Sequence, residues 1–397
     1  METRKTDTLT KRIIFTIFII ILIRTGNFIP IPRIDQRYLI NILNSNPSLK
    51  TFFNSETLIL SIFSLGIIPS INASILIQLL TNIVPGLENL QKEEGEAGRK
   101  KIKQYTRLLT LILAIIESLT ITFSLRPILF NWNPAICIQI TLALTTGSMI
   151  VLWLSDLITE NGIGNGSSII ITLNILSVLP STIKKIVQSA NIVNFIISFV
   201  SFTVIMSGIV FVQGAVRSIP LISAKQLLAQ ENRQLNQNSV IPLRINQGGV
   251  MPVIFSSTLL SFITIGLNYI LNLQILPSEI ANSQNIAIFY GIINFLLIFV
   301  FSTFYSNLIL NPKEISKNLN KMAVAIPNIR PGKQTTEFLQ KTLNRLSFLG
   351  AIFLGMLVAL PNIRSSYGFG ITSLIILVGV TIDTGRQIKT LLITQKY

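Results

Sequence analysis

Histidine is absent from this 397-residue sequence, cysteine occurs only once, at Cys137, and charged residues make up only 12% of the chain. Without histidine and with a single thiol, the chain has no intramolecular disulfide, no zinc site built from His and Cys, and no triad with a histidine base. Cys137 lies in an apolar run, which is typical of a buried, unreactive thiol. We therefore expect no catalytic residue, cofactor or metal site, and no enzyme.

The scarcity of charge indicates an integral membrane protein. Soluble domains average about 25% charged residues, whereas half of this chain is hydrophobic and its mean hydropathy is +0.63. The apolar runs are continuous rather than alternating, which argues against a β-barrel. Ten runs are near the roughly 20 residues that a helix needs to cross the hydrocarbon. We predict an all-α protein with spans at 13–32, 65–84, 108–125, 136–158, 167–183, 192–212, 250–272, 286–310, 343–361 and 367–385.

The net charge of +16 is distributed unevenly along the chain. Of the 32 basic residues, 24 lie in five regions. These are the two termini and the segments 85–107, 213–249 and 311–342, the last counted with its edge. These five regions share one side of the predicted topology, so the positive-inside rule places both termini on the cytoplasmic or stromal side. Topology alone does not explain the length of loops 213–249 and 311–342. Two interpretations stay open for them: topology signals only, or docking of an acidic or nucleic-acid partner.

A short motif occurs twice. Residues 66–74 read "GIIPSINAS" and residues 249–257 read "GVMPVIFSS", and each begins the second span of a five-span half. Because each half has an odd number of spans, the halves must face opposite ways across the membrane, as in an inverted repeat with a functional path between the halves. We predict halves at 1–191 and 192–397.

Both copies of the motif place Gly and Pro inside a membrane span. Backbone groups freed by such a break cannot face lipid and need partners in protein or water. The second and seventh spans are thus expected to line an interior path. A tight helix crossing is the other interpretation, because small residues at 72–74 and 256–257 would let two backbones approach. Both can hold together.

Few charges lie within the apolar spans. Asp156 and Asp383 are near cytoplasmic ends and are expected to anchor the membrane interface, while Arg24 is near an outer end and can snorkel. Glu117 is in the middle of its span, and an intramembrane carboxylate is a functional hypothesis by default. Its expected partner is the polar row Asn72–Gln78. The alternative is a neutral, hydrogen-bonded Glu at a packed interface.

The sequence offers no internal energy source. The nearest match to a phosphate-binding loop, "IRPGKQTT" at 329–336, lacks the preceding glycine and follows no predicted strand. A single carboxylate in the middle of a span is also little for ion-coupled transport. Energy for any transport is therefore expected from outside the chain.

Six stretches, in order along the chain, resemble signatures of the SecY family of protein-conducting channel subunits. They are "FIPIPRID" (28–35), "LGIIPSINASILIQLL" (65–80), "EGEAGRKKIKQYTR" (94–107), "ITENGIGNGSSIII" (158–171), "NQGGVMPVIF" (246–255) and "NIRPGKQT" (328–335). The resemblance implies a clamshell of two inverted five-helix halves around an hourglass pore. An aliphatic ring would seal the waist, a plug near 48–62 would close it from outside, and a gate would open sideways into lipid.

The resemblance also assigns residues to these parts. The pore ring would consist of Ile67, Ile71, Ile171, Ile175 and Ile254, with a contribution from the tenth span near 378–382. A dry apolar collar of this kind blocks ions by dewetting and yields to a polypeptide. The lateral gate would carry Asn72, Gln78 and Glu117 facing Phe262. The plug departs from the Gly- and Ser-rich sequence that is expected of bacterial relatives.

Docking residues and partners follow from the same resemblance. Loops 213–249 and 311–342 would bind a ribosome or the SecA motor through Arg217, Lys225, Arg330 and Lys333. A clamp-like SecE subunit is expected, a SecG-like subunit is a second candidate, and precursors with signal sequences would be the cargo. No cofactor is implied.

Composition bears on the compartment. An Ile-, Asn- and Lys-rich chain without histidine resembles algal plastid-encoded members of the family, which implies the thylakoid membrane; a bacterial plasma membrane is the alternative. Two other functions stay open at this point. One is a secondary transporter with inverted repeats that binds a small solute at the midplane, and the other is a membrane scaffold that recruits partners through its basic loops.

Overall fold

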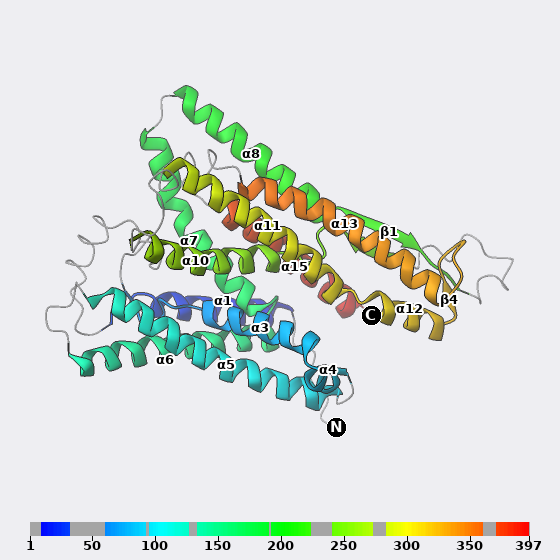
Figure 1. Cartoon of the computed structure of the whole chain (residues 1–397), viewed down its shortest axis with the longest axis horizontal. Helices are drawn as coiled ribbons and strands as arrows, with labels where there is room; N and C mark the ends of the chain where they lie inside the picture. The colour runs from blue at the N-terminus through cyan, green and yellow to red at the C-terminus, as the bar shows by residue number, and fades with distance from the viewer. Residues whose placement is uncertain are drawn as a thin grey trace. The chain divides into compact units, whose positions relative to one another are not determined.

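The computed structural model describes residues 9–31, 60–92, 95–126, 133–189, 192–223, 240–272, 283–359 and 371–396 (Figure 1). Helices dominate, and the chain separates into two compact units. Unit 1 comprises Met1–Ile183 with Asp383–Tyr397, and unit 2 comprises Lys184–Ile382. Each unit is described by itself.

Unit 1 is built around a long helix, α5 (Gly95–Ser124), which packs against α3 (Ile68–Ile83) and α6 (Pro134–Asn161). The remaining helices of the unit are α1 (Leu9–Gly26), which packs against α6, the short α4 (Pro85–Lys92), and α7 (Gly166–Ser189) up to Ile183. The last part of α15 (Ile371–Lys396) also belongs to this unit. The segment 85–107, predicted as a loop, is thus largely helical.

The core of unit 1 joins the last residues of the predicted plug segment to the spans. Leu60 is fully buried and packs with Leu65, Ile140 and Leu144, and Ile62 lies against this cluster. Gly147 on α6 permits the approach, since a Cβ there would lie 2.0 Å from the carbonyl oxygen of Ile62. Residues 48–59 of the predicted plug lie outside the described residues.

The turn between α6 and α7 explains the Gly-rich motif at 158–171. Gly164 has a φ of 82°, a left-handed conformation that favours glycine. A Cβ at Gly166 would lie 2.0 Å from the carbonyl oxygen of Ser155, so only glycine fits there. The side-chain oxygen of Asn165 accepts from the backbone N–H of Ser167 at 3.1 Å and caps the start of α7.

Unit 2 contains the end of α7, α8 (Ile192–Gly214), α10 (Met251–Asn272), α11 (Ser283–Ile309), α12 (Pro312–Lys321), α13 (Lys333–Ala359) and most of α15. Helix α11 packs against α10 and α13. The apolar core brings together residues from five helices: Ile209, Val253, Ile298, Leu354, Leu374, Ile375 and Val378.

The two long basic loops of unit 2 are joined by short strands. Strand β1 (Val216–Pro220) pairs antiparallel with β3 (Val240–Arg244), and β2 (Ile222–Ser223) pairs antiparallel with β4 (Val324–Ala325). A second apolar cluster lies beneath them, with Ile219, Leu243, Ile326, Leu339, Leu343 and Leu346 buried. Segment 311–342, predicted as a loop, contains α12, β4 and the first ten residues of α13.

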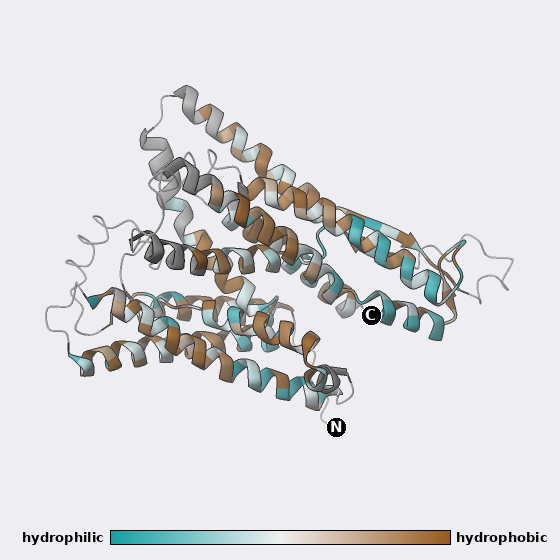
Figure 2. Cartoon of the chain, viewed as in Figure 1, coloured by the Kyte–Doolittle hydropathy of each residue, from teal (hydrophilic) through white to brown (hydrophobic). Residues whose placement is uncertain are grey.

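Each of the ten predicted spans overlaps a described helix. Within the described residues, α5, α6, α11 and α13 are each long and apolar enough to cross a bilayer. Apolar residues run along most of these helices in Figure 2. Large side chains such as Phe18, Phe123, Phe199 and Phe211 are more than half exposed, as expected where the surrounding solvent is lipid.

Candidate functional site

The repeated motif forms the same backbone structure in both units. Gly66 has a φ of 57° and Gly249 a φ of 60°, and a helix begins two residues after each. Pro69 and Pro252 each occupy the second helical position, where a missing N–H costs no hydrogen bond. The sequence match of nine residues therefore reflects a shared helix start.

The bonding after each glycine also matches. The N–H groups of Ser70 and Ile71 reach the carbonyl of Ile67 at 3.1 and 3.2 Å. In the second copy, the N–H groups of Val253 and Ile254 reach the carbonyl of Val250 at 3.1 and 3.2 Å. The repeat thus makes Ile71 equivalent to Ile254, and Ile67 equivalent to Val250.

These first-turn aliphatic side chains are buried. Ile67 and Ile71 are 2% and 7% exposed, and Val250 and Ile254 are each 8% exposed. Val250 is absent from the predicted ring, although the register of the repeat is a signal that could have identified it. The predicted ring residues Ile67, Ile71 and Ile254 are therefore buried apolar side chains at the start of a helix, just after the left-handed glycine.

Helix α7 carries the other predicted ring residues of unit 1. Ile171 and Ile175 are half-buried. Their helix lies close to the break before α3, since a Cβ at Gly66 would lie 3.9 Å from Nδ2 of Asn174. Val378, in the predicted stretch of the tenth span, is buried in unit 2. The complete ring would join residues of both units and stays a prediction.

The polar pair expected at the gate is present in unit 1. Nδ2 of Asn72 on α3 donates to Oε1 of Glu117 on α5 at 3.0 Å, so Asn72 is the partner within the predicted row. Asn72 is buried, whereas Gln78 is exposed. The two residues are six positions apart on one helix, so their side chains point in directions around the helix axis that differ by roughly 120°. Phe262 lies on α10, and its side chain is outside the described set.

Arg24 is bonded inside unit 1. Its Nη2 donates to the backbone carbonyl of Leu173 on α7, and the side chain is half-buried. The α7 carbonyl thus provides an acceptor for a side chain that the sequence indicated only as able to snorkel. The expected burial of Cys137 is met only in part, as its free thiol is half-buried.

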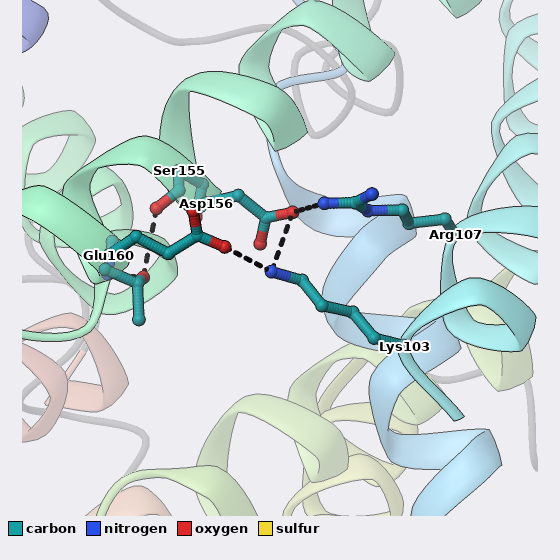
Figure 3. A network of polar contacts seen from close by, with 7 residues as sticks. Lys103, Arg107, Ser155, Asp156 and Glu160 are labelled. Carbon is teal, nitrogen blue, oxygen red and sulfur yellow. Dashed lines mark hydrogen bonds and ion pairs between the residues drawn. The ribbon is translucent and has the colours of Figure 1, made fainter. Parts of the chain in front are cut away.

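Four charged side chains at the polar ends of α5 and α6 form a network (Figure 3). Oδ2 of Asp156 accepts from Nη2 of Arg107 at 2.5 Å and lies 3.3 Å from Nζ of Lys103. Nζ of Lys103 also contacts Oε1 of Glu160 at 3.0 Å. Asp156 thus joins α6 to α5.

The predicted docking residues of unit 2 lie on an exposed basic surface. Arg217 on β1, Arg330 and Lys333 are all exposed, while Lys225 lies outside the described residues. Other exposed basic residues on these segments are Lys313, Lys317, Lys321, Lys341 and Arg345. Beside Arg330 is a hollow of about 430 Å³, lined by Ile222, Ala323, Ala325, Ile326, Asn328, Ile329, Arg330 and Pro331.

Backbone geometry fixes the turn that presents Arg330. Asn328 and Gly332 have φ values of 62° and 104°. The hydroxyl of Thr335 donates to the carbonyl of Arg330 at 3.0 Å, and that of Ser316 donates to the carbonyl of Gly332 at 2.9 Å. The arginine side chain is therefore held outward on an anchored backbone.

Comparison with known proteins agrees with this arrangement. A profile of the SecY family matches residues 61–385. The chain belongs to the SecY family. The protein translocase subunit SecY of Guillardia theta is 44% identical over 99% of this chain and 97% of its own length. SecY of Porphyra purpurea is 44% identical over 99% and 98%, and SecY of a Synechocystis strain is 43% identical over 97% and 92%.

Solved structures show the same fold. The structure titled as that of a protein conducting channel covers 99% of this chain and 95% of its own, with a TM-score of 0.69 and 16% identity. Sec61 in a canine ribosome-channel complex covers the same shares, with a TM-score of 0.67 and 15% identity. The protein is thus a multi-pass helical membrane protein with the fold of SecY-family channels.

Proposed function

We infer that this chain is the channel subunit of a Sec translocase, which conducts unfolded polypeptides across a membrane and releases apolar segments sideways into it. Membership of the SecY family, at more than 40% identity to translocase subunits over nearly the whole chain, supports this function. It is a transport channel rather than an enzyme, driven by an external motor or by translation.

The observation that carries the mechanism is the duplicated helix start. A small-solute transporter presents polar groups to its ligand at a broken helix, whereas both breaks here are followed by aliphatic side chains. Ile67 and Ile71 in one copy, and Val250 and Ile254 in the other, suit a dry collar that polypeptide can part. We therefore propose a pore between halves 1–191 and 192–397, with Ile171 and Ile175 completing the ring and residues 48–62 as its plug.

The hydrogen bond from Asn72 to Glu117 supports the proposed lateral gate. One polar pair at an otherwise apolar seam keeps closure marginal, so that the apolar helix of a signal sequence is able to open it. Gln78 and Phe262 would belong to the same seam.

Partners and location are proposed on the same basis. Two related solved structures are titled as ribosome complexes, and the exposed surface around Arg217, Arg330 and Lys333 has the charge to bind ribosomal RNA or an acidic motor surface. We propose docking of the ribosome or SecA there, and assembly with SecE-like and SecG-like subunits. The algal plastid relatives favour the thylakoid membrane, with both termini stromal.

Site-directed photo-crosslinking tests the channel. A crosslinker at Ile71 is expected to capture a secretory precursor arrested in mid-transfer, because that side chain would line the polypeptide's path. The control is Ile83 on the same helix, which is 73% exposed. Absence of the precursor adduct at Ile71, or equal labelling at Ile83, would contradict the channel function.

A further inference from the structure

In each unit, a side chain on one helix donates a hydrogen bond to a backbone carbonyl of a helix far away in the sequence. In unit 1, Nη2 of Arg24 on α1 donates to the carbonyl of Leu173 on α7. In unit 2, Nε2 of Gln213 on α8 donates to the carbonyl of Ile375 on α15 at 3.1 Å. Each bond therefore ties a side chain of one helix to the backbone of another.

The two bonds occupy equivalent places in the predicted inverted repeat. Helices α1 and α8 overlap the first predicted span of each half, and α7 and α15 overlap the fifth. Arg24 lies in the last turn of α1, and Gln213 is the last residue but one of α8. In both halves, the end of the first span is thus bonded to the fifth span.

The carbonyl acceptors are available although both accepting helices are intact. A carbonyl oxygen has two lone pairs, and within a helix only one of them is used by the N–H four residues further on. Gln213 and Ile375 are 7% and 0% exposed, and a buried amide without a hydrogen-bond partner is costly. A donor buried in this way therefore stays with its protein acceptor.

The bond from Arg24 reaches α7 between two predicted ring residues. Ile171 and Ile175 lie two positions before and two positions after Leu173. The next residue, Asn174, lies near the left-handed glycine before α3, since a Cβ on that glycine would be 3.9 Å from Nδ2 of Asn174. The bond thus holds α7 beside the helix start that carries the other predicted ring residues of unit 1.

The bond from Gln213 reaches α15 one turn before a close contact with α10. A Cβ at Gly379 would lie 2.2 Å from Cγ2 of Val250 and 3.2 Å from Oε1 of Gln213. Gly379 directly follows Val378 of the predicted ring stretch, and Val250 is the counterpart of Ile67 in the repeat. In unit 2 as well, the bonded part of the fifth span therefore lies against the helix start of the second.

The second polar atom of Gln213 bears on the purpose of the bond. Its Oε1 is buried and has no hydrogen-bond partner within the described part of the chain. A buried acceptor without a partner costs free energy, which an apolar side chain of similar shape would avoid. Stability alone does not explain a glutamine at this position, whereas a bond that fixes α15 does.

We propose that Arg24 and Gln213 are equivalent positioning residues, each holding the fifth span of its half so that the aliphatic side chains of that helix join the pore ring. A helix turns by about 100° per residue, so a bond to one carbonyl restrains which side chains face the neighbouring helix start. The inference rests on the proposed channel function, and it gives neither residue a contact with the transported polypeptide.

Site-directed photo-crosslinking to an arrested precursor, in the assembled complex, separates positioning from general stability. Arg24→Met removes the N–H donors and keeps a long unbranched side chain. We expect the precursor adduct at Ile175 on α7 to fall several-fold, while the adduct at Ile71 on α3 is unchanged. Equal losses at both positions, or no loss at Ile175, would overturn the proposal.

The equivalent test in unit 2 does not depend on the α1 variant. Gln213→Met should lower the adduct at Val378 several-fold relative to that at Ile254, and it also removes the unpaired acceptor, which favours folding. The control is Gln340→Met on α13, because the half-buried Gln340 likewise joins two helices, donating to Oδ1 of Asn307 at 2.8 Å. An unchanged ratio in Gln213→Met, or the same change in the control, would overturn the proposal for this half.

Rescue by other donors shows whether the bond itself is responsible. Lysine and glutamine side chains both retain N–H donors, so Arg24→Lys or Arg24→Gln should restore the ratio of the Ile175 and Ile71 adducts. Failure of both variants to do so would overturn the assigned role of the bond to Leu173.

Ion leak through the resting complex in vesicles gives a readout without precursor. It should rise several-fold in Arg24→Met and Gln213→Met and stay at the level of the unaltered chain in Gln340→Met. An unchanged leak in both variants would overturn the link between these bonds and the seal. Failure of the channel function itself is distinguishable, because the unaltered chain would then give no precursor adduct at Ile71.

Discussion

Gly66 and Gly249 each have a left-handed backbone just before a membrane helix. A side chain in this conformation meets the neighbouring carbonyl oxygen, which costs roughly 1–2 kcal/mol per residue. Glycine therefore lets the helix of each repeat start after a left-handed residue without this cost. The residue type follows from backbone geometry rather than from crowding, since a Cβ at Gly249 would have no atom within 4 Å.

Replacing Gly249 with Ala should consequently lower the free energy of unfolding by about 1–2 kcal/mol, through backbone strain alone. Denaturant unfolding of the purified complex in detergent measures this change. Gly214→Ala is the control, because Gly214 also has open space around it and does not have a positive φ. Equal stability of the two variants would show that the left-handed conformation carries no cost here.

The pair formed by Asn72 and Glu117 is the second feature at the scale of single residues. Hydrogen bonds between membrane helices average about 0.6 kcal/mol and reach about 1.7 kcal/mol in double-mutant cycles. We expect a coupling energy in this range between Asn72→Ala and Glu117→Ala, measured from the unfolding of both single variants and the double variant. In a control cycle, Asn72→Ala with Thr106→Ala should show no coupling, because the Thr106 hydroxyl donates to its own helix at Ile102.

A coupling energy of zero for Asn72 and Glu117 would mean that the hydrogen bond does not hold α3 to α5. A larger effect on precursor transport than on stability would instead connect the pair to gate opening. The two readouts separate a packing role from a gating role.

At the scale of elements, the main finding is that the two long basic loops of unit 2 are one structure. Two residues of β2 pair with two of β4, and β1 pairs with β3 over a shared apolar cluster. Predicted docking residues from separate parts of the sequence, such as Arg217 and Arg330, are thereby carried by one folded element. Its rigidity would orient both charges towards one partner.

Cysteine crosslinking tests the β2–β4 register. Directly paired antiparallel residues have Cα atoms about 4.5–5.5 Å apart, within the range that a disulfide requires. In a Cys137→Ser background, Ile222→Cys with Ala325→Cys should crosslink on mild oxidation, as detected by gel shift after proteolysis between the two sites. Ser223→Cys with Ala325→Cys, which is out of register, is the control and should crosslink less; the reverse order would contradict the pairing.

Sequence patterns predicted the spans because lipid burial requires continuous apolar runs, and α8 and α11 show such runs throughout. The same signal does not predict where α5 and α13 begin, because both helices start in polar sequence ahead of their predicted spans. The repeated motif predicted both helix starts. The polar residues within apolar spans predicted the Asn72–Glu117 pair. The contact of Arg24 with Leu173 was unpredictable, since a backbone carbonyl leaves no mark in a sequence.

At the scale of the whole molecule, the chain combines ten predicted spans, five of which contain no charged residue, with a basic surface on unit 2. The exposed basic residues of α12 and α13 lie on helical segments. A topology signal requires only the positive charge and not a folded segment. The buried Leu339 and Leu343 fix this part of α13 on the strands, so the charge is displayed on a rigid support. An ordered basic surface favours docking of a partner over a purely topological role.

Arg330→Glu tests that role directly. The backbone of Arg330 is held by Thr335, while its side chain is exposed, so the change should leave assembly and thermal stability intact. Reversing the charge at a motor-binding site should weaken SecA-driven transport into vesicles by about tenfold, equivalent to about 1.4 kcal/mol. The matched control is Lys341→Glu, an exposed reversal of the same sign on α13.

Similar losses in both variants would indicate a general effect of surface charge, and unchanged transport in Arg330→Glu would remove this turn from the motor-binding surface. Loss of ribosome binding with normal SecA-driven transport would assign the turn to co-translational docking, because the two partners then use different parts of the basic surface.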